Sequence, residues 1–191
     1  MKLRSIIFEL VQTTFPDISM GLLVAHVTTK LVNRRTFEMY LASVFFALLP
    51  DIDTGLQIFF SKKLDTHHRD LTHLPLVVIG VALSATLFSP LFGTIAAASL
   101  LLHFLHDSIG FDEGGWGLKW FWPFSKHSFA FFQTKDGKRH FVTTWTAEEI
   151  ARRRPMEFKE WITRYYLGVS SHSILAWCSL VLSIGVITWT W

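Results

Sequence analysis

The longest uncharged stretch of the chain decides its fold. Residues 71–106 read LTHLPLVVIGVALSATLFSPLFGTIAAASLLLHFLH, which is 36 residues without Asp, Glu, Lys or Arg. Ser89, Pro90 and Gly93 interrupt this run near its middle, and residues of these types favour a turn. The pattern predicts two apolar helices joined by a tight turn. Each arm of roughly 15 to 19 residues would be about 25 Å long, a little short of the roughly 30 Å hydrocarbon core of a bilayer.

A second uncharged stretch, Tyr165–Trp191, is 27 residues long and is long enough to span a membrane. Its Trp177, Trp189 and Trp191 suit a membrane interface. Half of the 191 residues are hydrophobic, 17% are charged and the mean hydropathy is +0.35, which excludes a disordered chain. We therefore predict a mainly α-helical membrane protein. Two soluble alternatives stay open, a buried core hairpin and a helical adaptor with a histidine-rich core.

The rest of the chain predicts shorter elements. Uncharged runs of 12 residues at Ile18–Thr29 and Met39–Pro50 predict helices packed at the bilayer or partly within it. The pair Asp136-Gly137 lies between aromatic and β-branched runs, which predicts a small β-hairpin in the region after residue 127. Thr146, followed by two glutamates, predicts the start of a helix.

Histidines and carboxylates gather at the borders of the apolar runs. His103 and Asp107 are four residues apart on a predicted helix, so both project from one face and could bind one ion. Asp51 and Asp53 follow a proline that ends a predicted helix, and alternating acids in a turn can bridge cations. The single cysteine, Cys178, excludes an internal disulfide framework and a cysteine-based zinc site. Any metal would therefore be held by histidines and carboxylates.

A third group of histidines precedes the first apolar arm. His67, His68 and His73 fall within seven residues, and imidazole is the usual ligand of zinc and manganese-class ions. Arg69, in the same segment, could pair with a phosphate or carboxylate. His26 lies alone in an apolar helix. Each of these groups also has a structural interpretation, as a solvated turn or as a hydrogen-bonded core histidine.

The predicted hairpin brings two of these groups together. If residues 74–102 form a membrane hairpin, His73 enters and His103 leaves the bilayer on the same side. An aspartate inside the membrane costs roughly 2.5 to 3.5 kcal/mol. A bound metal would balance that charge, and a ring of arginines would also do so. The sequence therefore predicts a polar site at one membrane face. By the positive-inside rule this face is cytoplasmic, because basic residues flank it at Arg34, Arg35, Lys62, Lys63, Arg152, Arg153 and Arg154.

Together these motifs resemble the YdjM-like bacterial inner-membrane proteins, a family of membrane-bound metal-dependent hydrolases that is distantly similar to zinc-dependent phospholipase C and P1-type nucleases. The resemblance covers roughly residues 20 to 127. The elements that carry it are His26, the turn Leu49-Pro50-Asp51-Ile52-Asp53, the pairs His68-Arg69 and Thr72-His73, the pair His103 and Asp107, and Trp122-Pro123-Phe124.

The resemblance implies a multi-pass inner-membrane hydrolase that uses a metal-activated water to attack a phosphorus or carbonyl centre of a phosphoester or lipid-like substrate. It implies two or three divalent ions, with zinc the first choice and manganese next. The implied ligands are His26, Asp51, Asp53, His68, His73, His103 and Asp107. Arg69 and Asp53 are the expected catalytic residues, with Arg69 binding the anionic group of the substrate.

The expected partners follow from the location of the site. A site at the bilayer surface favours an amphiphilic or lipid substrate. The net charge of +3 comes from basic and acidic residues spread along the chain, so no nucleic acid is expected. The competing hypothesis is a non-enzymatic membrane protein with a structural metal site or a divalent-ion transport path.

The predicted organisation is a single membrane-associated domain over residues 1–191. Within it we expect a helical core with the metal site at 18–127, a hairpin and an amphipathic helix at 128–164, and a C-terminal transmembrane helix at 165–191.

Overall fold

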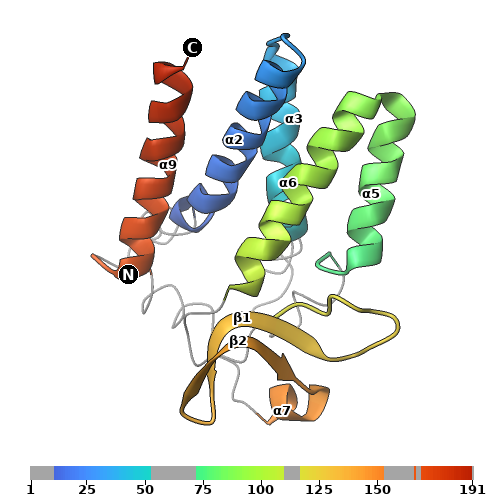
Figure 1. The fold of residues 1–191 in the computed structure, drawn as a ribbon, viewed down its shortest axis with the longest axis vertical. Coiled ribbons are helices and arrows are strands. Elements are labelled where there is room, and N and C mark those ends of the chain that lie inside the picture. Colours follow the sequence, from blue (N-terminus) through green and yellow to red (C-terminus); the bar gives the residue numbers. More distant parts are fainter. Residues whose placement is uncertain (1–10, 53–71, 110–116, 153–165, 167–168, 191) are drawn as a thin grey trace.

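The computed structural model describes residues 11–52, 72–109, 117–152, 166 and 169–190. In this part of the chain, five long helices stand side by side above a small β-hairpin (Figure 1). The helices are α2 (Phe15–Leu31), α3 (Phe37–Leu48), α5 (Pro75–Phe88), α6 (Pro90–Ser108) and α9 (Ser171–Trp189). The other elements are the 3-10 turn η1 (Leu49–Asp51), strands β1 (Ser128–Lys135) and β2 (Lys138–Trp145), and the short helix α7 (Ala147–Ala151). The mainly α-helical class with a small β-hairpin is confirmed.

The long uncharged stretch forms the two predicted helices, α5 and α6. Pro75 and Pro90 each lie in the first turn of their helix, where a missing backbone N–H costs nothing. Ser89 joins the helices in an extended conformation. A side chain at Gly93 would collide with Thr86, so the two helices approach closely beside their turn.

The helix bundle is built around α2 and α6. Helix α2 contacts α3, α6 and α9, and α6 also contacts α3 and α5. A Cβ atom at Gly21 of α2 would lie 2.8 Å from the Cα atom of Val44, so this glycine allows α2 and α3 to touch. Between α3 and α6, the buried hydroxyls of Ser43 and Ser99 lie 3.0 Å apart. Small residues and buried hydroxyls are typical of helix contacts in membranes.

Large apolar side chains cover the outer surfaces of α5 and α9. Leu83 and Leu87 of α5 and Val181 and Leu182 of α9 are exposed, as expected for a surface that faces lipid. By length and composition, α6 and the segment His172–Trp189 of α9 could each cross a membrane, while α5 is a shorter apolar helix. The 19 residues of α6 correspond to about 28 Å.

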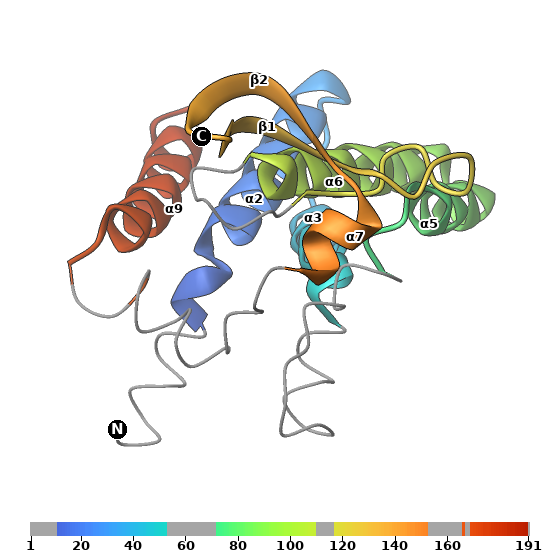
Figure 2. The ribbon, with the colours of Figure 1, turned by 90° about the horizontal axis from the view of Figure 1, so that it is seen from below.

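The β-hairpin lies across one end of the bundle, as the view in Figure 2 shows. Its turn contains Asp136 and Gly137, whose φ angles are 53° and 72°, the type of turn that Asp-Gly favours. Residue Ile109, directly after α6, forms a bridge with Phe131 of β1. We call this end of the bundle, where α3 and α6 end and α5 begins, the hairpin end, and the opposite end the far end. Thr146 caps α7 as predicted, whereas the rest of the predicted amphipathic helix lies outside the described residues.

Candidate metal centre

Four predicted ligands come together at the hairpin end of the bundle. Asp51 is the last residue of η1, directly after α3. His73 lies two residues before α5, and His103 and Asp107 lie one turn apart near the end of α6. One ligand atom from each of these residues lies within 4.8 Å of each of the others. We call these four residues the His₂Asp₂ cluster.

The distances within the cluster are those of a coordination shell. The Nε2 atom of His73 lies 3.0 Å from Oδ2 of Asp107, 3.3 Å from Nε2 of His103 and 3.7 Å from Oδ1 of Asp51. The Nε2 atom of His103 lies 3.6 Å from Oδ2 of Asp107 and 3.8 Å from Oδ1 of Asp51. A tetrahedral ion about 2.0 to 2.1 Å from each ligand would hold its ligand atoms about 3.3 to 3.4 Å apart. The cluster could therefore hold one metal ion after only small shifts.

Both histidines direct Nε2 into the cluster and Nδ1 away from it. The Nδ1 atom of His103 lies 2.9 Å from Oδ1 of Asp17. The Nδ1 atom of His73 lies 3.2 Å from the hydroxyl oxygen of Thr72. Metal-binding histidines usually have such a partner on the second nitrogen, because it fixes the ring and its tautomer. The outer contacts thus fit the same ligand role as the inner distances.

Asp17 is the residue that sequence analysis missed. It lies in the first turn of α2 and is only 3% exposed. Besides His103, its Oδ1 atom lies 3.5 Å from Nδ1 of His106. An acidic residue in the first turn of a helix is common, because it interacts favourably with the helix dipole, so its type and position gave no reason to select it. The one available signal was its place directly before an uncharged run.

The cluster is closed on its imidazole side and more open on its carboxylate side. The side chains of His73 and His103 are 0% and 1% exposed, whereas those of Asp107 and Asp51 are 13% and 35% exposed. The ring of Phe104 stacks on His73, with centroids 5.9 Å apart. A small molecule could therefore reach the cluster from the side of Asp51.

A family model described as YdjM inner membrane protein matches residues 13–191. The chain belongs to this family. The match includes all five long helices, the His₂Asp₂ cluster and the β-hairpin. No curated protein and no solved structure gave a significant match. Together with the two candidate spans, membership identifies an inner-membrane protein.

In this YdjM family member, the structure separates His26 from the other predicted ligands. His26 lies nine residues after Asp17 on α2, which is about 13 Å along the helix axis. Its Nε2 atom lies 2.7 Å from the hydroxyl of Thr190 and its Nδ1 atom 3.4 Å from that of Tyr40. Thr190 follows the C-terminus of α9 at the far end. His26 thus links α2, α3 and the end of α9, and it is not one of the four residues of the His₂Asp₂ cluster.

Two of the basic residues expected beside the site also lie at the far end. Arg34 and Arg35 belong to the connection between α2 and α3, and the Arg35 guanidinium donates to the backbone oxygen of Thr190 at 3.3 Å. The expectation that these two arginines flank the cluster is corrected, because α2 runs away from the hairpin end before they occur. The other predicted site residues, Asp53, His68 and Arg69, lie outside the described residues.

Proposed function

We propose that this YdjM family member is a membrane-bound, metal-dependent hydrolase that acts on a phosphoester or lipid-like substrate. The observation that carries this proposal is the His₂Asp₂ cluster, which has the distances of a metal shell and an open side at Asp51. Its position at one end of an apolar bundle would let an amphiphilic molecule reach it from the bilayer.

The described residues could bind a divalent ion that would support hydrolysis. An ion held by the cluster would activate water and balance negative charge on a phosphoester. The Nε2 atoms of His73 and His103 can act as ligands because both rings have their Nδ1 partners on the opposite side. The carboxylates of Asp51 and Asp107 supply two negative charges, which match one divalent cation. The buried imidazole side leaves the side of Asp51 for the substrate.

The identity and number of ions belong to the same proposal. Zinc is the first choice and manganese the second, because the ligands combine imidazoles with carboxylates. The four described ligands suffice for one ion, and Asp53 and His68 would contribute to further ions, giving two or three in all. Arg69 would bind the anionic group of the substrate, and Asp53 would be the second catalytic residue.

Hydrolysis can be tested directly on the purified protein. We expect detergent-solubilised protein to contain a divalent metal and to cleave at least one member of a panel of phosphate monoesters, phosphodiesters and phospholipids. A chelator should stop turnover, and zinc or manganese should restore it. Metal-loaded protein that cleaves nothing on the panel would contradict the proposed activity.

A structural metal site is the second candidate, because four ligands are enough to fill a tetrahedral ion. If the metal is structural, its removal lowers the melting temperature, and the metal-loaded protein hydrolyses no substrate. If the protein is a hydrolase, the metal-loaded protein hydrolyses a substrate. Measuring melting temperature and turnover on the same chelated and reloaded samples separates the two functions.

We also propose that the protein crosses the membrane several times with the cluster facing the cytoplasm. Among the described residues, more lysines and arginines lie at the hairpin end than at the far end, which is the asymmetry of the positive-inside rule. Those at the hairpin end are Lys119, Lys126, Lys135, Lys138, Arg139 and Arg152, and those at the far end are Lys30, Arg34 and Arg35.

Thiol labelling tests this orientation. In a Cys178→Ser background, which removes the single native cysteine, Asp136→Cys marks the hairpin turn and Asn33→Cys marks the far end. We expect a membrane-impermeant thiol reagent to label the cysteine at position 33 in intact spheroplasts and the one at position 136 only after lysis. The reverse pattern would place the cluster on the periplasmic side.

A further inference from the structure

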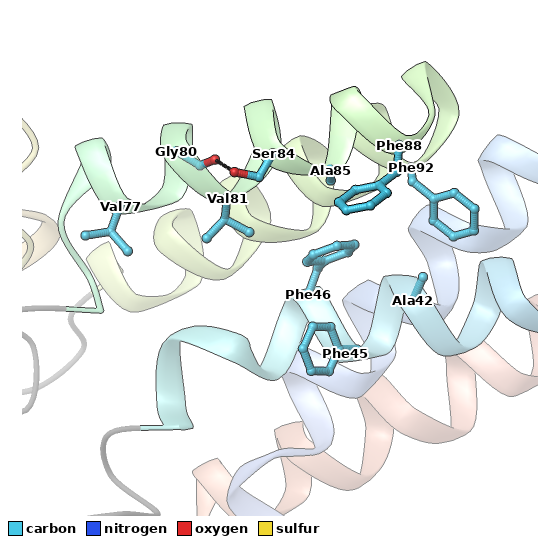
Figure 3. A pocket seen from close by; sticks show the side chains of 10 residues that line it. All are labelled: Ala42, Phe45, Phe46, Val77, Gly80, Val81, Ser84, Ala85, Phe88 and Phe92. Atoms are coloured by element: carbon cyan, nitrogen blue, oxygen red, sulfur yellow. Dashed lines mark hydrogen bonds between the residues drawn. The ribbon is translucent and has the colours of Figure 1, made fainter.

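A groove between α3 and α5 extends away from the His₂Asp₂ cluster. Its volume is about 660 Å³, within the usual range for a small-molecule site. Phe45 and Phe46 of α3 line one wall, Gly80 of α5 lies on the other, and Phe88 and Phe92 lie toward the far end (Figure 3). Nine of the ten lining residues therefore belong to α3 and α5, the helices that flank Asp51 and His73 in the sequence, and Phe92 belongs to α6.

The groove begins at the helix ends from which the chain runs to the cluster. Val77, which lines it, lies in the first turn of α5, four residues after His73 in the sequence, and Phe46 lies in the last turn of α3, five residues before Asp51. From Val77 to Phe88 the wall formed by α5 extends about 16 Å toward the far end. A molecule with its polar group at the cluster could thus lay a chain along these helices.

The lining of the groove suits a hydrocarbon chain. Ser84 has the one polar side chain among the residues that line it, and its hydroxyl donates to the backbone oxygen of Gly80 at 2.8 Å. The remaining lining side chains are phenylalanine, valine and alanine. A polar occupant would lose its hydrogen bonds to water here and gain none in return.

We propose that this groove holds the alkyl or acyl chain of an amphiphile whose anionic head group lies at the His₂Asp₂ cluster. The inference rests on the proposed function for the head group and adds a site for the chain. In a bilayer the chain is already in an apolar medium, so the groove contributes position rather than hydrophobic affinity. Holding the head group beside the cluster raises its effective concentration there.

Two glycines provide a matched test. A Cβ atom at Gly80, in the groove, or at Gly185, in α9, would meet no atom within 4 Å. Gly80→Trp therefore adds bulk to the groove without a clash in the backbone, and Gly185→Trp adds the same bulk to another apolar helix. A second groove variant, Ala42→Trp, adds bulk from the facing helix α3.

The experiment measures binding of two probes to the full-length, zinc-loaded protein in nanodiscs. Dodecyl phosphate has a chain and methyl phosphate does not. We expect Gly80→Trp and Ala42→Trp to weaken dodecyl phosphate binding at least about tenfold, because a blocked groove no longer holds the chain in the position that raises the effective concentration of the head group at the cluster. Metal content and methyl phosphate binding should stay at the wild-type level, and Gly185→Trp should match the wild type for both probes.

Each of the other outcomes would overturn either the chain site in the groove or the proposed function. Equal dodecyl phosphate binding in Gly80→Trp, Ala42→Trp and Gly185→Trp would overturn the chain site, even if phosphoesters are hydrolysed. A change of oligomeric state in the groove variants with dodecyl phosphate binding unchanged would make the groove a contact between copies of the chain and would overturn the proposal. Groove-dependent binding without any hydrolysis would instead refute the proposed function and leave the chain site standing. Failure of the wild type to bind dodecyl phosphate would overturn the inference.

Discussion

His103→Ala is expected to remove the bound metal and, with it, hydrolysis. The Nε2 atom of His103 lies within 3.8 Å of a ligand atom of each of the other three cluster residues, so its loss leaves a shell with three ligands. Losing an outer partner of a metal ligand typically costs about 10- to 100-fold in affinity, and losing the ligand itself should cost more. Metal content after dialysis and the affinity from chelator competition measure the effect.

Two further variants make this result specific to the cluster. Asp107→Asn changes a ligand that is 13% exposed and leaves the buried contact between Asp17 and His103 in place, so loss of metal there cannot be attributed to a disrupted core. His26→Ala changes a histidine of the same bundle that contacts Tyr40 and Thr190 instead, and it should keep the wild-type metal content. Wild-type metal affinity in both His103→Ala and Asp107→Asn would exclude this cluster as the metal site.

The helical core was predictable because its signals are local. The uncharged stretch and its break at Ser89 and Pro90 define α5 and α6, and the Asp-Gly turn defines the hairpin. The cluster was predictable as well, because a hairpin returns to the side where it began. Two helices joined by a tight turn usually pack antiparallel, so His73 and His103 were expected to lie close together.

The errors concern α2, whose rotation and direction the sequence does not reveal. About two and a half turns of helix separate Asp17 from His26, and both are buried. Which of them lies at the hairpin end depends on the direction in which α2 packs against α6 and α9. The family resemblance placed His26 in the expected ligand set, although a lone histidine in an apolar helix is also typical of a hydrogen-bonded core residue. The packing of α2 places Asp17 at the cluster and His26 at the far end instead.

Asp17→Asn is expected to weaken metal binding by about tenfold, and Asp17→Ala by as much as about 100-fold. Asp17 contacts Nδ1 of His103 at 2.9 Å, and a carboxylate there fixes the ring and raises the basicity of Nε2 toward the metal. Asparagine keeps an oxygen acceptor of the same shape but loses the negative charge, whereas alanine loses both. The order wild type, Asn, Ala should appear in the dissociation constant for zinc measured by chelator competition.

The melting temperature of the metal-free protein distinguishes this positioning role from a merely structural one. Asparagine keeps an oxygen that can accept from Nδ1 of His103, so Asp17→Asn should leave the melting temperature of the metal-free protein close to the wild-type value. Metal affinity should therefore fall while metal-free stability stays almost unchanged. If Asp17→Asn lowers the melting temperature of the metal-free protein while the zinc dissociation constant stays the same, Asp17 supports the bundle and does not orient His103 for a metal.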